Sequence, residues 1–361
     1  MSQRDNQLKF ESDWKISLEE IHPHLLSRPK ETDVIKLLQE LSIAFVDRNE
    51  LLKSYGSKAD YVSAYSQVFL PTNAPKLEFL VEQLPIEIRN DFKKGNWQFI
   101  DFGCGPGTYS LSWLNLFPNS NCLMIDSANA MLKQAKQLVS GIFGEGRIID
   151  SESKLKEGKR VLFFGNVINE VSEKLAQDLI KKYSPDYVIM IEPGTKASFS
   201  QVAKIRQHLL SHDYSIHYPC LSQGACPIAP EGKVVENDWC HQVLRVTHDQ
   251  SVERLCQLAR LDRKIMPMIG HVYSKNEIQT AETSEGLLEG RVVQFLQESK
   301  FAFEYRICCF IEGEHKIIHC LLPKKKLSKD QKKDLKKASV GVKFYLNVLK
   351  EEKGKIHATL V

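Results

Sequence analysis

The stretch Asp101-Phe-Gly-Cys-Gly-Pro-Gly-Thr108 decides the fold that we expect for this chain. It follows an apolar run at 97–101 that predicts a β-strand, and it leads into a helical pattern at 108–115. A glycine-rich turn between a strand and a helix lets the backbone approach a ligand closely. Asp126 ends the next apolar run, 23 residues after Gly103, near the ~20 residues expected for a carboxylate that binds a ribose. The stretch therefore predicts an α/β fold with a nucleoside site.

Strand and helix patterns alternate through residues 97–219, which is typical of a parallel sheet covered by helices. Further strands are expected at the short apolar runs 122–126, 147–150, 160–165 and 187–192. Helices are expected at 128–139 and 198–210, followed by an extended segment at 215–219. We therefore assign residues 91–219 to one Rossmann-like domain.

The rest of the chain divides into three further segments. Residues 1–90 place apolar side chains at helical spacing and predict a helical domain. Residues 220–290 lose the strand–helix rhythm and are rich in Cys, which predicts a region held together by a bound metal or cluster. Residues 291–361 predict a β hairpin and a Lys-rich helix, at whose start Ser328 and Gln331 have the spacing of a capping box.

Two classes of ligand compete for the glycine-rich stretch. Nicotinamide dinucleotide sites need a third glycine three residues after the second, whereas single residues separate the glycines here, at Gly103, Gly105 and Gly107. With Asp101 in front, the arrangement resembles motif I of S-adenosylmethionine (SAM) dependent methyltransferases. The resemblance implies that Asp101 orients the methionine end of SAM and that the glycines lie against its methionine and ribose. It further implies that Asp126 accepts the ribose hydroxyls and that Asp150 lies beside the adenine amine.

Each of these residues also has a purely structural interpretation. Gly107 permits close packing of the following helix, and Cys104 fills the loop as a small side chain. Asp126 is in position to cap the helix expected from residue 128. Asp150 is alternatively a surface acid. These alternatives stay open on the sequence alone.

The segment Gly165-Asn-Val-Ile-Asn-Glu170 follows the fourth expected strand, where many SAM-dependent methyltransferases face their methyl acceptor. Its polar residues, Asn166, Asn169 and Glu170, are the candidates for catalysis. The segment lacks the Asn-Pro-Pro-Tyr signature that binds an exocyclic base amine, so it does not define the acceptor. Asn169 or Glu170 alternatively caps the next helix.

Cysteines form a second pattern, Cys220-x5-Cys226-Pro227 followed by Asp238-Trp-Cys240-His241, with Cys308 or Cys309 on a later strand as a fourth thiol. Four thiolates hold iron–sulfur clusters and equally structural zinc. The spacing is neither that of a common zinc finger nor the close triplet of radical SAM enzymes. The cysteines are alternatively buried free thiols. His241 is alternatively a ligand in place of the fourth Cys, or a residue at the surface or behind the ligands.

Together these motifs and Ile191-Glu-Pro-Gly-Thr195 resemble one family, the methyltransferase-like protein of the mitochondrial ribosomal small subunit (ribosomal small subunit protein twenty-two type) and its bacterial members. The resemblance covers roughly residues 60–310. It implies a class I SAM-dependent methyltransferase fold, a 4Fe-4S cluster, and action on the small ribosomal subunit or its rRNA. A non-catalytic assembly factor for the same particle, and a methyltransferase for small molecules or proteins with residues 1–90 as a lid, are the alternatives.

The resemblance also assigns ligands to the cluster, with zinc as the alternative metal: Cys220, Cys226, Cys240 and, by counting from Arg291, Cys308. Adjacent residues of a strand point to opposite faces, so only one of Cys308 and Cys309 can reach the cluster. The basic segment that precedes the fourth Cys in the family is largely replaced here by residues 298–304.

The composition indicates an ordinary soluble protein, with 42% hydrophobic and 26% charged residues. No run approaches the ~20 apolar residues of a membrane span, and nine Cys in a chain without a signal-peptide pattern favour reduced thiols. We expect a cytoplasmic monomer that contacts no membrane. Residues 324–337 contain eight Lys against two Asp, a charge suited either to RNA phosphates or to a solvated helix.

Overall fold

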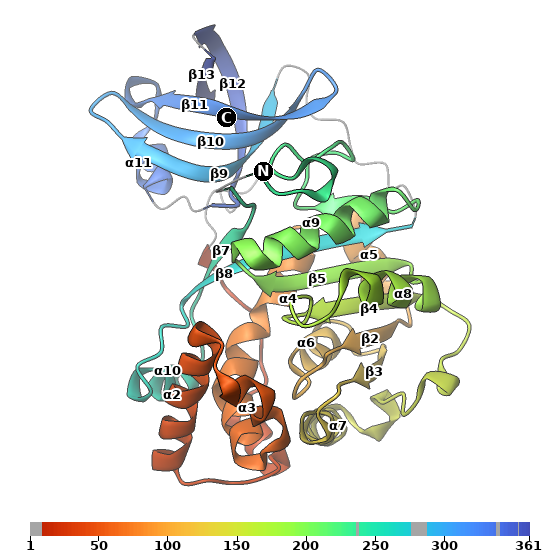
Figure 1. Cartoon of the computed structure of the whole chain (residues 1–361). Helices are drawn as coiled ribbons and strands as arrows, with labels where there is room; N and C mark the ends of the chain where they lie inside the picture. Colours follow the sequence, from red (N-terminus) through yellow and green to blue (C-terminus); the bar gives the residue numbers. More distant parts are fainter. Residues whose placement is uncertain (1–8, 236–237, 276–286, 337–339, 353) are drawn as a thin grey trace.

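The computed structural model describes residues 9–235, 238–275, 287–336, 340–352 and 354–361. Within these residues, eight strands form a central sheet in the order β1-β7-β8-β5-β4-β2-β3, with β6 also paired to β8 (Figure 1). The bounds are β1 Lys9–Phe10, β2 Gln98–Phe102, β3 Asn121–Ile125, β4 Arg160–Gly165, β5 Tyr187–Pro193, β6 Ser215–Tyr218, β7 Gln242–Val246 and β8 Ile265–Ser274.

The glycine-rich stretch lies where the chain changes direction across this sheet. Strands β3, β2, β4 and β5 are parallel neighbours, and β8 runs antiparallel to β5. The chain winds outward from β2 to β3 and then back across β4 to β5, which is a doubly wound order. In such an order ligands bind outside the carboxyl ends of the strands at the switch point. The predicted class I SAM-dependent methyltransferase fold is confirmed.

Helices cover both faces of the sheet. One face packs on α4 (Pro75–Glu82), α5 (Ile86–Lys94), α6 (Thr108–Leu116) and α7 (Asn129–Phe143), and the other on α8 (Glu173–Tyr183) and α9 (Lys196–Leu210). Successive strand residues belong to different cores: Phe163 to the first and Phe164 to the second. Because both faces are buried, the strands are almost continuously apolar in sequence.

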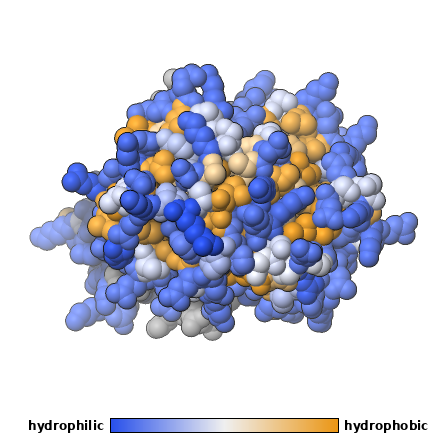
Figure 2. Space-filling model, turned by 90° about the horizontal axis from the view of Figure 1, so that it is seen from below, coloured by the Kyte–Doolittle hydropathy of each residue, from blue (hydrophilic) through white to orange (hydrophobic). Residues whose placement is uncertain are grey.

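The N-terminal residues are helical and lie over one end of the sheet. After α1 (Leu18–Ile21), α2 (Glu31–Asp47) and α3 (Ala59–Asn73) pack together with α10 (Gln250–Leu258) around a separate small core. Figure 2 views this end of the molecule and shows hydrophobic surface in the middle of a hydrophilic face. Ile43 and Val46 of α2 are among the exposed apolar side chains.

The C-terminal strands form a closed barrel rather than the isolated hairpin expected from the sequence. The barrel order is β10-β11-β13-β12-β9, and Figure 1 places it above α9, at the opposite end from α2 and α3. The bounds are β9 Leu288–Glu298, β10 Ala302–Ile311, β11 Glu314–Pro323, α11 Lys329–Leu335, β12 Lys343–Glu352 and β13 Lys355–Leu360. The turn at residues 312–313 and the capping box of Ser328 with Gln331 are present.

Two expected boundaries differ from the structure. Residues 147–150 are not a strand: a single bridge joins Ile148 to Cys122, because the short 3-10 helix η5 (Glu145–Arg147) takes up the preceding backbone. The sheet also does not end at residue 219, since β7 and β8 belong to it and come from the segment expected to be irregular. Pro267 and Gly270 inside β8 weaken its strand pattern in the sequence.

No helix in the described ranges is long and apolar enough to cross a bilayer.

Candidate functional site

Asp126 anchors the glycine-rich loop at the carboxyl end of β3. The Gly105 backbone N–H donates to one oxygen of its carboxylate at 2.8 Å, and the Ala128 N–H donates to the other at 2.8 Å. Ala128, not Asp126, is the N-cap of α7, so the capping alternative is wrong. Each carboxylate oxygen keeps a further lone pair. The two oxygens are therefore held in position to accept from a ligand.

Asp101 lies beneath the same loop and is fully enclosed. Ser110 donates its hydroxyl to Oδ2 of Asp101 at 2.7 Å, while Oδ1 is buried without a hydrogen-bond partner among the described residues. Burial raises the pKa of Asp101 to about 7, against the opposing hydrogen bond from Ser110. An unpaired buried carboxyl oxygen is costly unless a ligand completes it. A donor such as an ammonium group would complete the hydrogen bonding of this oxygen.

Each of the three loop positions is occupied by glycine for a different physical reason. A Cβ on Gly107 would lie 3.1 Å from the Cα of Ala135, so this position permits the packing of α6 on α7. A Cβ on Gly103 would lie 2.4 Å from the Cγ2 of Val167, which follows β4. At Gly105, whose φ is +54°, a Cβ would meet no atom of the described residues within 4 Å. Gly105 therefore borders the open side of the loop, where a cofactor fits.

We predict that Asp101 makes the folded protein less stable as the pH rises. Its folded pKa of about 7 is above the reference value of 3.8, so the stabilisation is complete below about pH 4 and lost as the pH rises to about 7. A shift of about three units corresponds to on the order of 4 kcal/mol. Relative to wild type, Asp101→Asn should gain unfolding free energy over this range, because an amide can still accept from Ser110. Urea unfolding without SAM measures it.

The matched control for Asp101→Asn is Asp150→Asn, an exposed carboxylate. Its pKa is lowered by its hydrogen bond and charge interaction with Lys154, so the pH trend of this variant should be weak and opposite in sign. Parallel pH profiles for wild type and Asp101→Asn would mean that the buried carboxyl ionises normally in the folded chain.

Asp150 itself lies on the surface in this structure. Its side chain is 61% exposed and ion-paired with Lys154 at 2.6 Å. It borders a shallow polar groove together with Asn129 and Leu132 of α7 and Ile148. Its expected position beside the adenine amine stays a prediction.

The segment after β4 faces the loop. Asn166 adopts a left-handed backbone with φ of +57°, and its side-chain amide donates to the Tyr109 hydroxyl at 3.4 Å. Asn169 donates to the Ser198 hydroxyl at 2.6 Å. The cap of α8 is Ser172, whose side chain accepts from the Leu175 N–H, so neither Asn169 nor Glu170 has that role. Burial raises the pKa of Glu170, and the nearby charge of Asp126 adds to the effect.

Two charged residues that the sequence did not single out lie behind this segment. Glu192, at the end of β5, accepts from the Val167 and Ile168 N–H groups at 2.9 and 3.0 Å and is fully buried. Burial raises the pKa of Glu192 to about 8 and lowers the pKa of buried Lys76 to about 7. Glu192 therefore fixes the backbone of the segment. Its position at the end of a parallel strand was the available signal, whereas Lys76 sits in an apolar helix pattern.

The N-terminal helices close over the loop. A Cβ on Gly56, in the 3-10 helix η4 (Tyr55–Ser57), would lie 3.1 Å from the Cβ of Ala128. Burial raises the pKa of the Tyr55 hydroxyl, with smaller contributions from Tyr65, Glu170 and Asp126. Tyr55 thus lies near enough to Asp126 and Glu170 for its pKa to respond to their charges.

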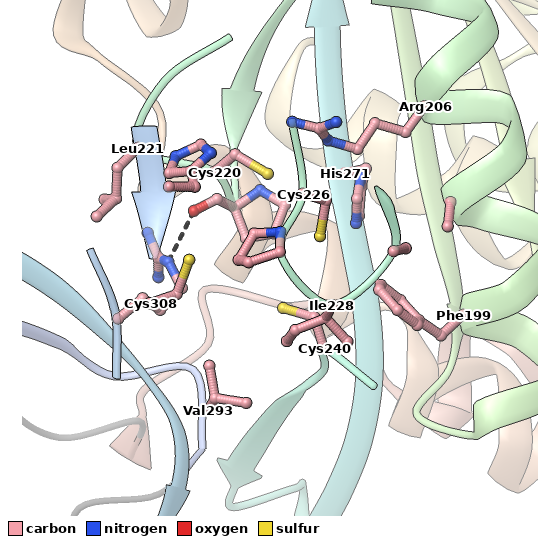
Figure 3. A pocket seen from close by; sticks show the side chains of 16 residues that line it. Phe199, Arg206, Cys220, Leu221, Cys226, Ile228, Cys240, His271, Val293 and Cys308 are labelled. Carbon is pink, nitrogen blue, oxygen red and sulfur yellow. Dashed lines mark hydrogen bonds between the residues drawn. The ribbon is translucent and has the colours of Figure 1, made fainter. Parts of the chain in front are cut away.

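The second site is a cavity lined by four cysteines. Cys220, Cys226, Cys240 and Cys308 all border it, and Figure 3 shows their sulfur atoms arranged around a common space. The cavity volume is about 40 Å³, more than the ~10–15 Å³ that one water needs. The sequence motifs thus converge in space, although no three His, Cys, Asp or Glu side chains of the described residues are close enough to hold a single metal ion.

The barrel places Cys308, and not Cys309, at the cavity. Cys308 lines the cavity, whereas Cys309 is fully buried and packs in the apolar core with Ile307 and Cys320. The two side chains point to opposite faces of β10, as alternation requires. His241 stacks on Trp239 and is not among the residues that line the cavity.

Two arginines give the thiol cavity a positive surround. Arg206 of α9 and Arg291 of β9 both line it, and Figure 3 shows Arg206 beside the cysteines. Burial alone would lower the pKa of Arg206, but the neighbouring Cys220 and Cys226 raise it overall. Burial raises the pKa of Cys240, with further increases from Cys220 and Cys226. Four thiols and two guanidiniums suit an anionic metal–thiolate group.

The chain is similar to one protein family and, more distantly, to solved structures of methyltransferases. The model of the family described as mitochondrial small ribosomal subunit Rsm22 matches residues 87–326. No curated protein matches in sequence. An O-methyltransferase family protein from Burkholderia thailandensis is 12% identical with a TM-score of 0.34, covering 70% of each chain. The M. capricolum TrmK structure with S-adenosyl-homocysteine is 13% identical with a TM-score of 0.29, covering 56% of this chain and 73% of that chain.

Proposed function

Since this chain belongs to the mitochondrial small ribosomal subunit Rsm22 family, we propose that it binds SAM and methylates RNA of the small ribosomal subunit. The observation that carries the proposal is the cradle of Asp101, Gly105 and Asp126 at the switch point of the sheet. We further propose that it acts in the cytoplasm, as a monomer, in ribosome biogenesis and thereby in translation.

In this proposal each part of SAM contacts a particular residue. The ribose hydroxyls donate to the two fixed oxygens of Asp126, and the ammonium donates to the unpaired Oδ1 of Asp101. The methionine chain lies along Gly105, and Asp150 borders the adenine. SAM supplies a methyl group on a sulfonium, so the protein mainly needs to orient the acceptor and exclude water.

The acceptor lies, in this proposal, against the segment after β4. Asn166 and Tyr109 present an amide and a hydroxyl to it, and Glu170 contributes a carboxylate of raised pKa. Glu192 positions these groups through its bonds to the Val167 and Ile168 N–H groups. It acts as a positioning residue and does not itself touch the substrate.

We also propose that the four thiols hold an iron–sulfur cluster of the 4Fe-4S type, with zinc as the alternative. Cys220, Cys226, Cys240 and Cys308 are the ligands, and Arg206 and Arg291 offset the negative charge of the cluster. The ligands come from two loops and one barrel strand. The cluster would therefore join the barrel to the sheet and supply folding energy to a region with a thin core.

Transfer of radiolabel from SAM to small-subunit particles tests the function. Wild type should label the RNA of the particles, and Asp126→Ala should not, while Glu152→Gln, at an exposed carboxylate paired with Lys182, should label within a fewfold of wild type. Label on ribosomal protein instead of RNA would contradict the proposed acceptor.

A second candidate is a non-catalytic assembly factor that binds SAM and RNA. This candidate is favoured because polar groups on the acceptor side already have partners within the chain. Asn169 donates to Ser198, and one oxygen of Glu192 accepts from two backbone N–H groups. The same experiment separates the two functions. SAM binding together with particle binding, but without transfer of label, would support the assembly factor and exclude the enzyme.

A further inference from the structure

The C-terminal barrel has the topology of a known binding module. In chain order its strands are paired as one-two-three-five-four, closing back on the first, with β11 and β13 parallel. Helix α11 lies between the third strand, β11, and the fourth, β12. This is the arrangement of the OB-fold, a five-stranded barrel that binds oligonucleotides and oligosaccharides on the face of strands two and three and the flanking loops.

The face of β10 and β11 is only partly covered by the rest of the chain. Arg306 pairs with Asp238 at 2.8 Å, and His315 contacts Ser222 and Ala225, so one half packs against the cysteine segment. The other half of this face begins at Glu304 of β10.

On that other half, the carboxylate of Glu304 has partners on two neighbouring strands, of which Lys355 offsets its charge. His319 of β11 lies at 2.7 Å and Lys355 of β13 at 3.9 Å. The half thus presents polar groups without a net negative centre. The β9–β10 loop and the start of β13 lie at its two edges.

An exposed aromatic ring stands at one edge of this half. Phe301, in the loop between β9 and β10, is 76% exposed. The Lys324 N–H donates to the Phe301 carbonyl at 2.8 Å, which joins the 3-10 helix η8 (Lys324–Lys326) to the loop that carries the ring, and the Lys300 ammonium lies 5.9 Å from the ring centroid. Lys325 and Lys326 are exposed and have no ion pair within the described residues. An aromatic platform bordered by cations is what single-stranded nucleic acid binds.

The barrel segment differs in net charge from the remainder of the molecule. Residues 288–361 contain sixteen Lys and Arg against nine Asp and Glu, whereas the remaining residues contain 33 against 36. The barrel segment is therefore net positive and the rest slightly negative. Complementarity to a polyanion is thus confined to the part of the chain that has the OB topology.

We propose that this barrel binds single-stranded RNA, with a base stacked on Phe301 and phosphates beside Lys325 and Lys326. The inference adds a second surface to the proposed function. RNA held on the barrel lies on a different part of the molecule from the SAM loop, so its binding needs no SAM.

Fluorescence anisotropy with the full chain, purified without oxygen, and a labelled single-stranded RNA 12-mer tests the proposal in the absence of SAM. Phe301→Ala should weaken binding about tenfold, and Phe301→Trp should restore it. The double variant Lys325→Ala/Lys326→Ala should reduce the slope of log affinity against log salt by about 1.4. The charge-matched control Lys93→Ala/Lys94→Ala, on exposed positions of α5, should leave slope and affinity unchanged.

Unchanged affinity of Phe301→Ala, or equal affinity for a duplex of the same length, would overturn the proposal. Thermal melting of each variant verifies that it is folded. Loss of methyl transfer would not affect these measurements, because neither SAM nor a ribosomal particle is present. Failure of the proposed function and failure of this inference are therefore distinguishable.

Discussion

Replacing Asp126 by Ala should weaken SAM binding at least 100-fold. The carboxylate is fixed by the Gly105 and Ala128 N–H groups, each at 2.8 Å, so its free lone pairs are already oriented for the two ribose hydroxyls. Each charge-assisted hydrogen bond contributes about 1.5–3 kcal/mol, so two of them account for at least ~3 kcal/mol, about two powers of ten in Kd. The variant also frees the Gly105 N–H, which loosens the loop. Calorimetric titration with SAM measures the change.

Combining this change with Gly105→Ala should remove detectable binding. The φ of Gly105 is +54°, a conformation that costs an L-residue roughly 1–2 kcal/mol, and the added Cβ projects into the open side of the loop. Glu152→Gln is the matched control. Because Glu152 is exposed, paired with Lys182 and outside the proposed site, this variant should leave Kd nearly unchanged. Retained affinity in the double variant would contradict the site itself.

The cofactor loop could be predicted because its chemistry is local. Strand, glycine turn, helix and the next acid all lie within residues 97–126, so spacing alone relates them. Glu192 and Lys76 could not be predicted in the same way. Their burial and shifted pKa values arise when β5 and α4, far apart in sequence, pack behind the segment after β4. Only tertiary structure distinguishes such residues from ordinary surface charges.

The barrel escaped prediction for a related reason. The hairpin of β10 and β11 pairs close neighbours in sequence, with an obvious turn at Glu312 and Gly313. Closure instead depends on β9 pairing with β12 and on β11 pairing in parallel with β13. These contacts are non-local, and the alternating pattern of each strand is compatible with several partners. The strand pattern therefore indicated β structure but not which strands close the barrel.

The cysteine motifs were an intermediate case. Cys220, Cys226 and Cys240 were assigned through the family resemblance, and the structure brings them to one cavity. The choice between Cys308 and Cys309 as the fourth thiol depends on which way the side chains of β10 point. The sequence does not give this direction. The structure gives this direction, because Cys308 borders the cavity whereas Cys309 is fully buried in the core.

Cys308→Ala should abolish the iron–sulfur cluster, whereas Cys309→Ala should retain it. Cys308 lines the cavity with the three other thiols, and Cys309 packs in the barrel core. Protein purified without oxygen should be brown and contain about four iron and four sulfide per chain. Cys308→Ala should lose the colour and most of the iron, because three thiolates leave one iron without its protein ligand. Visible absorbance and metal analysis measure both.

Cys308→Ala should also be less stable than Cys309→Ala. The proposed cluster would join two loops to the barrel, so its loss in Cys308→Ala should remove folding energy, lower the melting temperature and increase amide exchange around Cys220, Cys226 and Cys240. Cys309→Ala removes one sulfur from a packed core and should cost only about 1 kcal/mol. Loss of colour in Cys309→Ala alone would reverse the assignment. A colourless wild type with one zinc per chain, lost in Cys308→Ala, would keep the four thiols as ligands and replace iron by zinc.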